Sequence, residues 1–360
     1  MKSFSDIFID CTSAGTKIPK ESYLDKGTHI IIDQGQNEIA GYTNEETGLY
    51  TDVPAIIFGD HTRAIKYVEE PFFLGADGVK LLKCKDKDAN YKYLYYALKS
   101  AKIPDTGYNR HFKWLKEIEI SYPDQSVQSK VVKTLDSLST VIDQRKDELI
   151  KLDDLIKARF VEIFGDPRSN PFGYEKKPLG NTCKVVTGNT PSRKVPEYYG
   201  DYIEWIKTDN IVSGLLHPTK ASEYLSEQGA LEGRTVDENA VLMACIAGSV
   251  ASIGRVCVTD RRVAFNQQIN AVVPEQYNIL FLYILLQISK DYLVEDINMA
   301  LKGILSKSKL EEKVFFVPPM KYQNDFAEFV RQVDKSKFVV QKSLEETQLL
   351  FDSLMQQYFS

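Results

Sequence analysis

The apolar positions between residues 124 and 164 follow a regular helical spacing, and the segment contains no glycine or proline. They are separated by alternating steps of four and three residues if Arg145 and Arg159 fill two of the places, which is typical of a coiled-coil seam. These positions are Val131, Leu135, Leu138, Ile142, Leu149, Leu152, Ile156 and Ile163. We predict a helix over Asp124–Phe164, roughly 60 Å long at about 1.5 Å per residue, that stops at Gly165 and Pro167.

The same pattern occurs a second time in the chain. Leu115 and Leu310 belong to an ungapped match between segments that lie 195 positions apart. The same offset links Pro123 to Pro318, Gln128 to Gln323, Leu149 to Leu344, Leu155 to Leu350 and Phe164 to Phe359. A repeat of this length indicates a globular domain followed by a long helix, and then the same again. A second helix is therefore predicted over residues 320–359, with Val340 and Leu354 where the first has Arg145 and Arg159.

The connectivity of the repeat predicts the direction of the two helices. The first helix leaves the first domain and ends at the second domain, from which the second helix then departs. If the helices pack through their seams, the second must return toward the first domain, so the pair is antiparallel with a pseudo-two-fold axis. The alternative is that each helix folds onto its own domain, but a stripe of two apolar positions per heptad is narrow for a globular face.

The remaining segments alternate short apolar runs with turn residues, which is typical of strands. The runs that we assign as strands are His29–Ile32, Ala55–Phe58, Gly78–Leu82, Tyr202–Ile206 and Ala240–Ile246, and a helix is predicted over Tyr91–Lys99. The predicted fold class is α+β, with two homologous α/β domains and two long helices that form an antiparallel coiled coil. The expected divisions are residues 1–123, 124–166, 167–319 and 320–360.

The composition excludes several classes of protein. The apolar content of 43% and charged content of 26% are ordinary for a globular protein, and the net charge of −5 argues against a protein that coats nucleic acid by bulk electrostatics. Five scattered cysteines without a CxxC pair indicate reduced thiols, so we expect a cytoplasmic protein. We see no signal peptide, no membrane-spanning run and no metal-ligand spacing, and we expect no cofactor.

Several motifs resemble those of one known family, and together they cover essentially the whole chain. In the second half they are Gly188–Ile211 (GNTPSRKVPEYYGDYIEWIKTDNI), Gly254–Val256 (GRV) and Asn266–Gln268 (NQQ). In the first half they are Asp33–Gln34, Gly41–Tyr42, Phe58–Arg63 (FGDHTR), Gly75–Gly78 (GADG) and Gly107–Lys116 (GYNRHFKWLK). The junctions around Pro123 and Pro318 and the FGDP ending at Phe164–Pro167 resemble helical regions of the same family. In this order, the chain resembles the specificity subunit of a Type I restriction-modification system.

The resemblance implies a function for each part of the chain. The two globular domains would be target recognition domains, each of which reads one half of a split sequence in double-stranded DNA. The helices would act as a ruler and would dock two modification (methyltransferase) subunits, while restriction (translocase and endonuclease) subunits would join through the assembled complex. The first domain departs from the pattern, because Ser13–Pro19 replaces a clean Gly-x-Thr-Pro turn.

The candidate DNA contacts of the second domain lie in three polar segments. Residues 188–194 combine backbone freedom, hydroxyls, an amide and two cations that suit a phosphate backbone and base edges. The candidates are Gly188, Asn189, Thr190, Ser192, Arg193, Lys194, Asn266, Gln267, Gln268 and Lys302. The amides of residues 266–268 suit adenine, and the Lys- and Ser-rich segment 302–309 suits phosphate. The alternatives are an ordinary solvated turn for residues 188–194 and buried amides that bond the backbone. Trp205 and the tyrosines fit packing better than base stacking.

Apart from Lys17, the candidate contacts of the first domain follow the strand Ala55–Phe58 or lie within the motif at residues 107–116. They are Lys17, His61, Thr62, Arg63, Lys66, Tyr108, Asn109, Arg110, His111 and Lys113. Arg63 could bond guanine with both ends of its guanidinium or bind phosphate. The alternative for residues 61–63 is a hairpin tip without a DNA contact.

Motifs of catalysis are largely absent from the sequence. We find no phosphate-binding GxxxxGK[ST] loop and no Ser/His/Asp or Cys/His arrangement. We therefore expect a non-catalytic DNA-specificity subunit. The first rival is a coiled-coil protein-interaction scaffold that binds no DNA, which the negative net charge favours. The second rival is an autonomous methyltransferase or nuclease.

Overall fold

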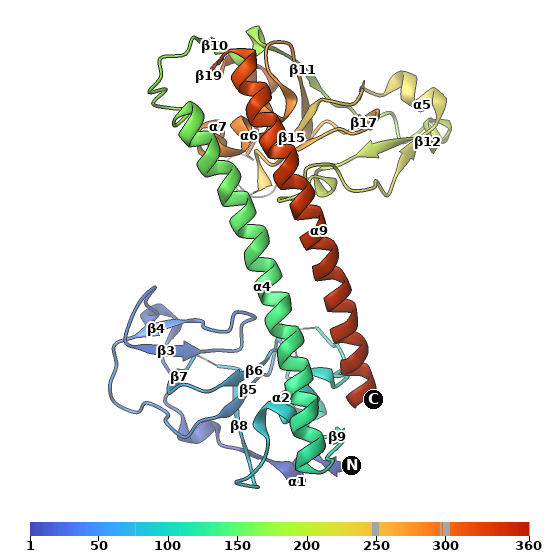
Figure 1. Ribbon diagram of the computed structural model, residues 1–360. Helices are drawn as coiled ribbons and strands as arrows, with labels where there is room; N and C mark the ends of the chain where they lie inside the picture. Colours follow the sequence, from blue (N-terminus) through green and yellow to red (C-terminus); the bar gives the residue numbers. More distant parts are fainter. Residues whose placement is uncertain (76, 108, 247–251, 296, 298–302, 360) are drawn as a thin grey trace. The chain divides into compact units, whose positions relative to one another are not determined.

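Figure 1 shows the computed structural model of the protein. The structure describes residues 1–75, 77–107, 109–246, 252–295, 297 and 303–359. The chain forms two compact units. The first unit comprises residues 1–145 with 343–360, and the second comprises residues 146–342. Each long helix therefore contributes one half to each unit.

The two long helices are α4 (Gln125–Phe164) and α9 (Met320–Phe359), each of 40 residues. They match the two predicted helices, and α4 begins one residue later than expected because the backbone carbonyl of Asp124 accepts the first bonds, from the amides of Val127 and Gln128. The first helix ends at Phe164 and is followed by Gly165. The φ of Gly165 is +75°, a left-handed conformation that would strain a residue with a side chain.

Contacts within each unit show that α4 and α9 run antiparallel, as predicted (Figure 1). In the first unit, Val131 and Leu135 of α4 share a core cluster with Phe351 and Met355 near the end of α9. In the second unit, the other half of α4 shares a cluster with the start of α9, through residues Ile156, Phe160, Phe326 and Val330. The alternative in which the helices fold only onto their own domains is therefore wrong.

Residues related by the 195-position offset make equivalent contacts. Val131 and Leu135 correspond to Phe326 and Val330, and Ile156 and Phe160 correspond to Phe351 and Met355. The glutamines at the helix starts also correspond. The side-chain amide of Gln128 donates to the carbonyl of Pro123 and that of Gln323 to Pro318, both at 2.8 Å. The duplication in the sequence thus produces a duplicated set of contacts.

The seam prediction fails near the end of α4. Arg159, placed in the seam, has a side chain that is 44% exposed and pairs with Glu162, whereas Phe160 and Phe164 are completely buried. Their rings pack against Phe281 and Phe326 of the second unit. The buried face advances by four residues here because this end of the helix enters a globular core instead of continuing a two-helix seam.

The first unit contains three sheets. A four-stranded sheet has the order β2 (Phe8–Asp10), β8 (Val79–Cys84), β5 (Ala55–Gly59), β6 (Ile65–Val68). A three-stranded sheet has the order β4 (Gly41–Thr43), β3 (His29–Ile32), β7 (Phe72–Leu74), and β1 (Lys2–Ser3) pairs with β9 (Glu119–Ile120). The helices are α1 (Phe4–Ile7), α2 (Tyr91–Ser100) and α3 (Phe112–Leu115), with 3-10 turns at Thr12–Ala14 and Lys20–Ser22.

The second unit repeats this arrangement. One sheet has the order β11 (Cys183–Thr187), β18 (Ile269–Pro274), β15 (Val241–Ala244), β16 (Val256–Val258). Another has the order β13 (Tyr224–Leu225), β12 (Tyr199–Ile206), β17 (Val263–Phe265), β14 (Thr235–Val236), and β10 (Lys176–Pro178) pairs with β19 (Val314–Phe316). The helices are α5 (Glu227–Glu232), α6 (Ile279–Ile288), α7 (Lys290–Val294) and α8 (Lys307–Glu312), with 3-10 turns at Leu179–Asn181, Pro196–Tyr198 and Thr208–Asn210.

The two units share one strand topology. Strands β3 and β7 are parallel neighbours in the first unit, as β12 and β17 are in the second, while the four-stranded sheet that contains β5 or β15 is antiparallel in both. The α+β class and the predicted strands are confirmed. The longest apolar run, α6, is packed into the core of the second unit. Across the described residues, we find no helix with the length and apolar character needed to cross a membrane.

Candidate nucleic-acid interface

The turn between β5 and β6 carries Arg63, a basic residue of the first unit that reaches solvent. Arg63 has a φ of 61°, a left-handed conformation that is uncommon for a residue with a side chain. Its guanidinium donates to the Asp105 carboxylate at 2.7 Å and to the carbonyl of Ile103 at 3.3 Å. The side chain is 33% exposed, so the arginine is held in place and still reaches solvent.

Gln34 organises the loops around this turn. Its side-chain oxygen accepts from the backbone amide of His61 at 3.2 Å, and its backbone oxygen accepts from the hydroxyl of Thr62. Its side-chain amide donates to the carbonyl of Asp77 at 3.0 Å, and the Asp77 carboxylate pairs with Lys17 at 3.2 Å. The structure thus brings Lys17, His61, Thr62 and Arg63 into one neighbourhood. The sequence showed Gln34 only as part of a motif, without this role.

The loop after α2 contributes exposed basic groups beside this turn. The backbone oxygen of Asn109 lies 3.2 Å from the imidazole of His61. Arg110 is exposed and makes no ion pair or hydrogen bond with the part of the chain that the structure describes. Lys113 is exposed and lies over the ring of Trp114 at 4.0 Å. Tyr108 lies outside the described residues.

Two candidates of the first unit are buried, which corrects their placement as surface contacts. The side chain of Lys66 is 2% exposed on β6, where its ammonium lies 3.5 Å from Asp33, and burial lowers the pKa of Lys66 against the opposing effect of that carboxylate. His111 is fully buried, and its imidazole lies 3.0 Å from the carbonyl of Asp60. The alternation of strand β6 turns Lys66 inward, whereas His111 lies just before α3 and is held by the carbonyl of Asp60, which also accepts from its backbone amide at 2.8 Å.

In the second unit, residues 188–190 and 266–267 meet. Gly188 is needed at the contact, because a Cβ atom there would lie 2.1 Å from the carbonyl oxygen of Asn266. The hydroxyl of Thr190 donates to the side-chain oxygen of Gln267. Asn189 is committed to the fold, since its amide donates to Glu232 at 2.9 Å and its oxygen accepts from the Arg234 amide at 2.7 Å.

The amides of residues 266 and 268 bond to each other. Asn266 is 6% exposed and its side-chain amide donates to the side-chain oxygen of Gln268 at 3.1 Å, while the Gln268 backbone amide donates back to Asn266 at 3.1 Å. Among the described residues, the exposed candidates of this unit are Thr190, Ser192, Arg193, Lys194 and Gln267. Lys302 lies outside the described residues.

Arg193 is the most constrained of these exposed groups. Its guanidinium donates to Glu223 at 2.6 Å and lies over the rings of Tyr199 and Trp205, at 4.5 and 5.2 Å from their centres. The other Glu223 oxygen accepts from the ammonium of Lys207. Trp205 is 3% exposed, in agreement with its predicted packing role.

Two carboxylates pair with the candidate arginines and were not singled out in the sequence. Asp105 holds Arg63, and Glu223 holds Arg193, although neither acid belongs to a motif. The hydrogen bond from Lys207 lowers the pKa of Glu223, burial opposes this and Arg193 reinforces it, so the acid is ionised at neutral pH. The sequence signal that could have pointed to Asp105 and Glu223 is an acidic residue in a loop near basic residues. Mixed charges of this kind usually mark a solvated surface, so the signal is weak.

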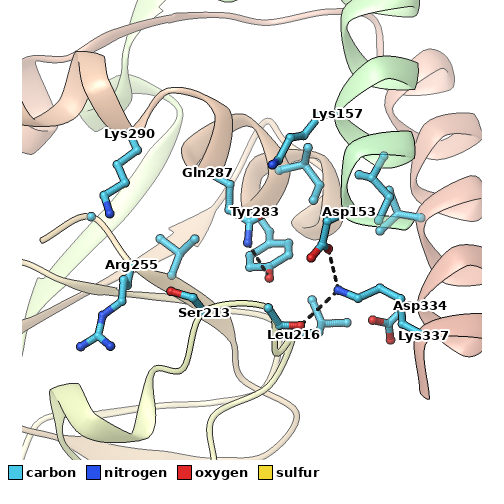
Figure 2. A pocket seen from close by; sticks show the side chains of 16 residues that line it. Asp153, Lys157, Ser213, Leu216, Arg255, Tyr283, Gln287, Lys290, Asp334 and Lys337 are labelled. Atoms are coloured by element: carbon cyan, nitrogen blue, oxygen red, sulfur yellow. Dashed lines mark hydrogen bonds and ion pairs between the residues drawn. The ribbon is translucent and has the colours of Figure 1, made fainter. Parts of the chain in front are cut away.

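A separate pocket of about 260 Å³ lies in the second unit beside the long helices (Figure 2). Lys337 of α9 faces Asp153 of α4 in it, with 2.7 Å between the ammonium and the carboxylate, and also donates to the carbonyl of Gly214 at 3.1 Å. Arg255 donates to the carbonyl of Thr208 at 3.1 Å. These cations bind the protein itself, so we interpret the pocket as the junction of helices and domain. Among the described residues, no cluster of His, Cys, Asp and Glu has the arrangement of a metal site.

Comparison with known proteins decides the family. A family model described as "Type I restriction modification DNA specificity domain" matches residues 1–153 and 171–347, one match for each half of the repeat. The chain belongs to this specificity-domain family. Its role is accordingly DNA sequence specificity within a Type I restriction-modification system.

Relatives of the specificity family align over much of the chain. The specificity subunit of the Type I restriction enzyme EcoR124I/EcoR124II from Escherichia coli is 26% identical over 284 residues, which are 74% of this chain and 69% of the relative. The MjaIX specificity subunit from Methanocaldococcus jannaschii is 23% identical and aligns over 73% of this chain and 67% of its own length.

A solved structure supports the fold of the specificity family. The S subunit of a Type I restriction-modification system from M. genitalium matches with a TM-score of 0.62 and 16% identity, over 100% of this chain and 95% of that one. A chain from a structure titled for complex assembly and conformational transition of the type I R-M system matches with a TM-score of 0.54 and 14% identity.

Proposed function

We propose that each unit of this specificity subunit reads one half of a bipartite, asymmetric DNA site. The observation that carries the proposal is one topology that appears twice with different residues at its exposed loops. The first unit presents Arg63 on the turn between β5 and β6, whereas the second presents Arg193 on the loop before β12. The two units have the same topology but different side chains on their exposed loops. This favours two different half-sites, because base edges are distinguished by the hydrogen-bond donors and acceptors that contact them.

The contact residues fall into two classes in this proposal. Arg63, Arg193 and Gln267 would reach base edges, while Lys17, Lys113, Lys194, Ser192 and Arg110 would bind phosphate. The remaining candidates, His61, Thr62, Asn109, Gly188, Asn189, Thr190, Asn266 and Gln268, would fix the backbones of these loops. We retain Tyr108 and Lys302 as phosphate contacts on their place in the sequence.

The long helices would set the gap between half-sites and dock two modification subunits. Several apolar side chains on their surfaces are exposed, which is typical of an interaction site. They include Ile150, Phe338, Val339 and Leu349, exposed by 60%, 71%, 66% and 70%. Restriction subunits would join through that complex. In this proposal residues 1–123 and 167–319 are the recognition domains, residues 124–166 and 320–360 are the helical regions, and the chain itself is non-catalytic and works in the cytoplasm beside the DNA.

Co-expression with the modification subunit, followed by methylome mapping, tests the proposal. We expect methylation at one interrupted, asymmetric sequence in cells that contain both chains, and none when this chain is omitted. A methylated sequence without a gap, or methylation that does not depend on this chain, would refute the reading of two half-sites.

Substitution of the two arginines separates the proposal from a protein scaffold. The double variant Arg63→Ala, Arg193→Ala should lose sequence-specific DNA binding in the assembled complex and retain the modification subunits. A scaffold would bind its partners with no dependence on DNA in either form. An autonomous methyltransferase or nuclease would instead be active as the purified chain with S-adenosylmethionine or Mg²⁺.

A further inference from the structure

Glu223 places a negative charge on the proposed DNA-reading surface, where DNA phosphates would repel it. Its side chain is 34% exposed and lies beside the basic loop of residues 188–194. A carboxylate near DNA phosphates weakens association, and more so at low salt. Its position therefore calls for a role that outweighs this repulsion. That role is found in what both of its oxygens contact.

The two oxygens of Glu223 bind two different cations. One oxygen accepts from the Arg193 guanidinium at 2.6 Å, and the other accepts from the Lys207 ammonium. Lys207 lies on the protein side of the acid, with its ammonium 5.1 Å from the ring centre of Trp205 and its side chain 26% exposed. Arg193 lies on the solvent side, with a side chain that is 56% exposed. Glu223 thus links the outer cation to an inner one.

The surface beneath Arg193 is also fixed. The hydroxyl of Tyr199 donates to the carbonyl of Pro191 at 2.7 Å, and the indole of Trp205 donates to the carbonyl of Asn189 at 3.3 Å. Both rings that face the guanidinium are therefore bonded to the same loop that carries it. An arginine held by a carboxylate and by two aromatic faces loses little conformational freedom when it binds a ligand.

One nitrogen of Arg193 contacts the acid, and the others make no hydrogen bond or ion pair within the described residues. Guanine presents two acceptors, O6 and N7, that match a pair of guanidinium donors in the major groove. Resting on the proposed DNA-reading function, we propose that Glu223 is a positioning residue that orients Arg193 to read a guanine in the half-site of the second unit. In this proposal Glu223 acts through Arg193 and does not itself read the base, since each of its oxygens already binds a cation.

The test is selection from a library of DNA duplexes with randomised sequence, bound by the full chain assembled with its modification subunits. Four variants are compared with the wild type: Glu223→Gln, Arg193→Lys, both together, and Asp237→Asn. Asp237 is the matched control, since it is an exposed acid of the same unit that pairs with a different arginine, Arg262, at 3.6 Å. Thermal unfolding of each variant accompanies the selection.

We expect the wild type to select guanine at one position of the half-site. Arg193→Lys should reduce this preference roughly 10-fold, since lysine cannot make the paired contact. Glu223→Gln should reduce the preference for the same guanine roughly 3- to 10-fold. Its affinity for random DNA should not fall, because the substitution removes a negative charge that repels phosphate. The double variant should be no worse than Arg193→Lys, because Glu223 acts through that arginine. Asp237→Asn should select like the wild type.

Four results would overturn the inference. Glu223→Gln could keep the guanine preference, or it could add to the loss in the Arg193→Lys background, which would indicate a role that does not pass through Arg193. It could instead abolish a preference for cytosine, whose amino group a carboxylate reads directly. Failure of the wild type to select any sequence would overturn the proposed function along with it, whereas the first three results leave that function intact.

Discussion

At the scale of single residues, both units hold an arginine at the surface with an acid from a neighbouring loop. The pairs are Arg63 with Asp105 and Arg193 with Glu223, at 2.7 and 2.6 Å. Exposed ion pairs contribute little to stability, typically about 0–1 kcal/mol. We infer that their value lies in orientation, because a guanidinium fixed before binding recognises a base with less entropic cost.

Arg63→Asn should separate DNA reading from folding. Asparagine tolerates the left-handed backbone at this position, so we expect the free energy of unfolding to change by less than about 1 kcal/mol. Discrimination between the cognate site and a site with one base changed should fall by about 1–3 kcal/mol, or roughly 5- to 150-fold. Competition binding with the assembled complex measures this ratio. Unchanged discrimination would exclude Arg63 from base reading.

The ion pairs of Glu223 predict a pH dependence. The bonds from Lys207 and Arg193 lower the pKa of Glu223 below its ordinary value of 4.5, so their stabilising contribution is complete above pH 4.5 and is lost as the pH falls through the lowered pKa. Between these limits the wild type should lose more stability than Glu223→Gln. Urea unfolding at a series of pH values compares the two. Parallel curves would show that the carboxylate is not paired in solution.

At the scale of elements, one pair of helices performs two kinds of packing. The first half of α4 packs with the end of α9, and its Asp136 also accepts a bond from Tyr96 of α2 at 2.6 Å. The other end of α4 is inserted into an aromatic cluster of the second unit through Phe160 and Phe164. The helix is therefore an integral part of each core, which makes substitutions on its buried face costly.

Phe160→Ala should destabilise the second unit strongly. The side chain is completely buried, and the loss of such a phenylalanine typically costs about 3–5 kcal/mol through lost burial and the cavity that remains. Phe338→Ala on α9 is the control, because its side chain is 71% exposed and its removal should change the free energy of unfolding by less than about 1 kcal/mol. Urea denaturation measures both, and equal effects would contradict the assigned burial.

At the scale of the whole molecule, the antiparallel helices join two units of like topology along a single chain. Each of the two helices, α4 and α9, runs for 40 residues without a break. A helix lengthens by a fixed rise per residue. The number of residues in such a helix therefore fixes its length, and in the proposed ruler this length sets the number of base pairs between the two half-sites.

Insertion of one heptad in each helix, after Arg145 and after Glu345, should lengthen the recognised gap. Seven residues add about 10 Å of helix, or roughly three base pairs at about 3.4 Å each. Methylation-sensitive sequencing of cells with the lengthened protein and its modification subunit should show the same half-sites with a wider gap. An unchanged gap would refute the ruler, and four alanines substituted at exposed helix positions provide a control of unchanged length.

The sequence by itself determined the elements of this protein and their duplication. Helix periodicity, strand alternation and the offset from Leu115 to Leu310 are local or collinear signals, so they survive without knowledge of the fold. The antiparallel direction of α4 and α9 followed from connectivity together with the prediction that the two helices pack through their apolar seams. The different loop sequences of the two domains, taken with the family resemblance, predict two different half-sites.

Only the tertiary structure decided which candidate side chains reach the surface and what holds them. Lys66 is buried on the inward side of strand β6, and His111 is buried just before α3 against the carbonyl of Asp60. Phe160 replaces Arg159 where α4 enters a core. Asp105 and Glu223 approach their arginines from positions 42 and 30 residues away. Such pairings arise from chain folding between distant loops, and no local periodicity encodes them.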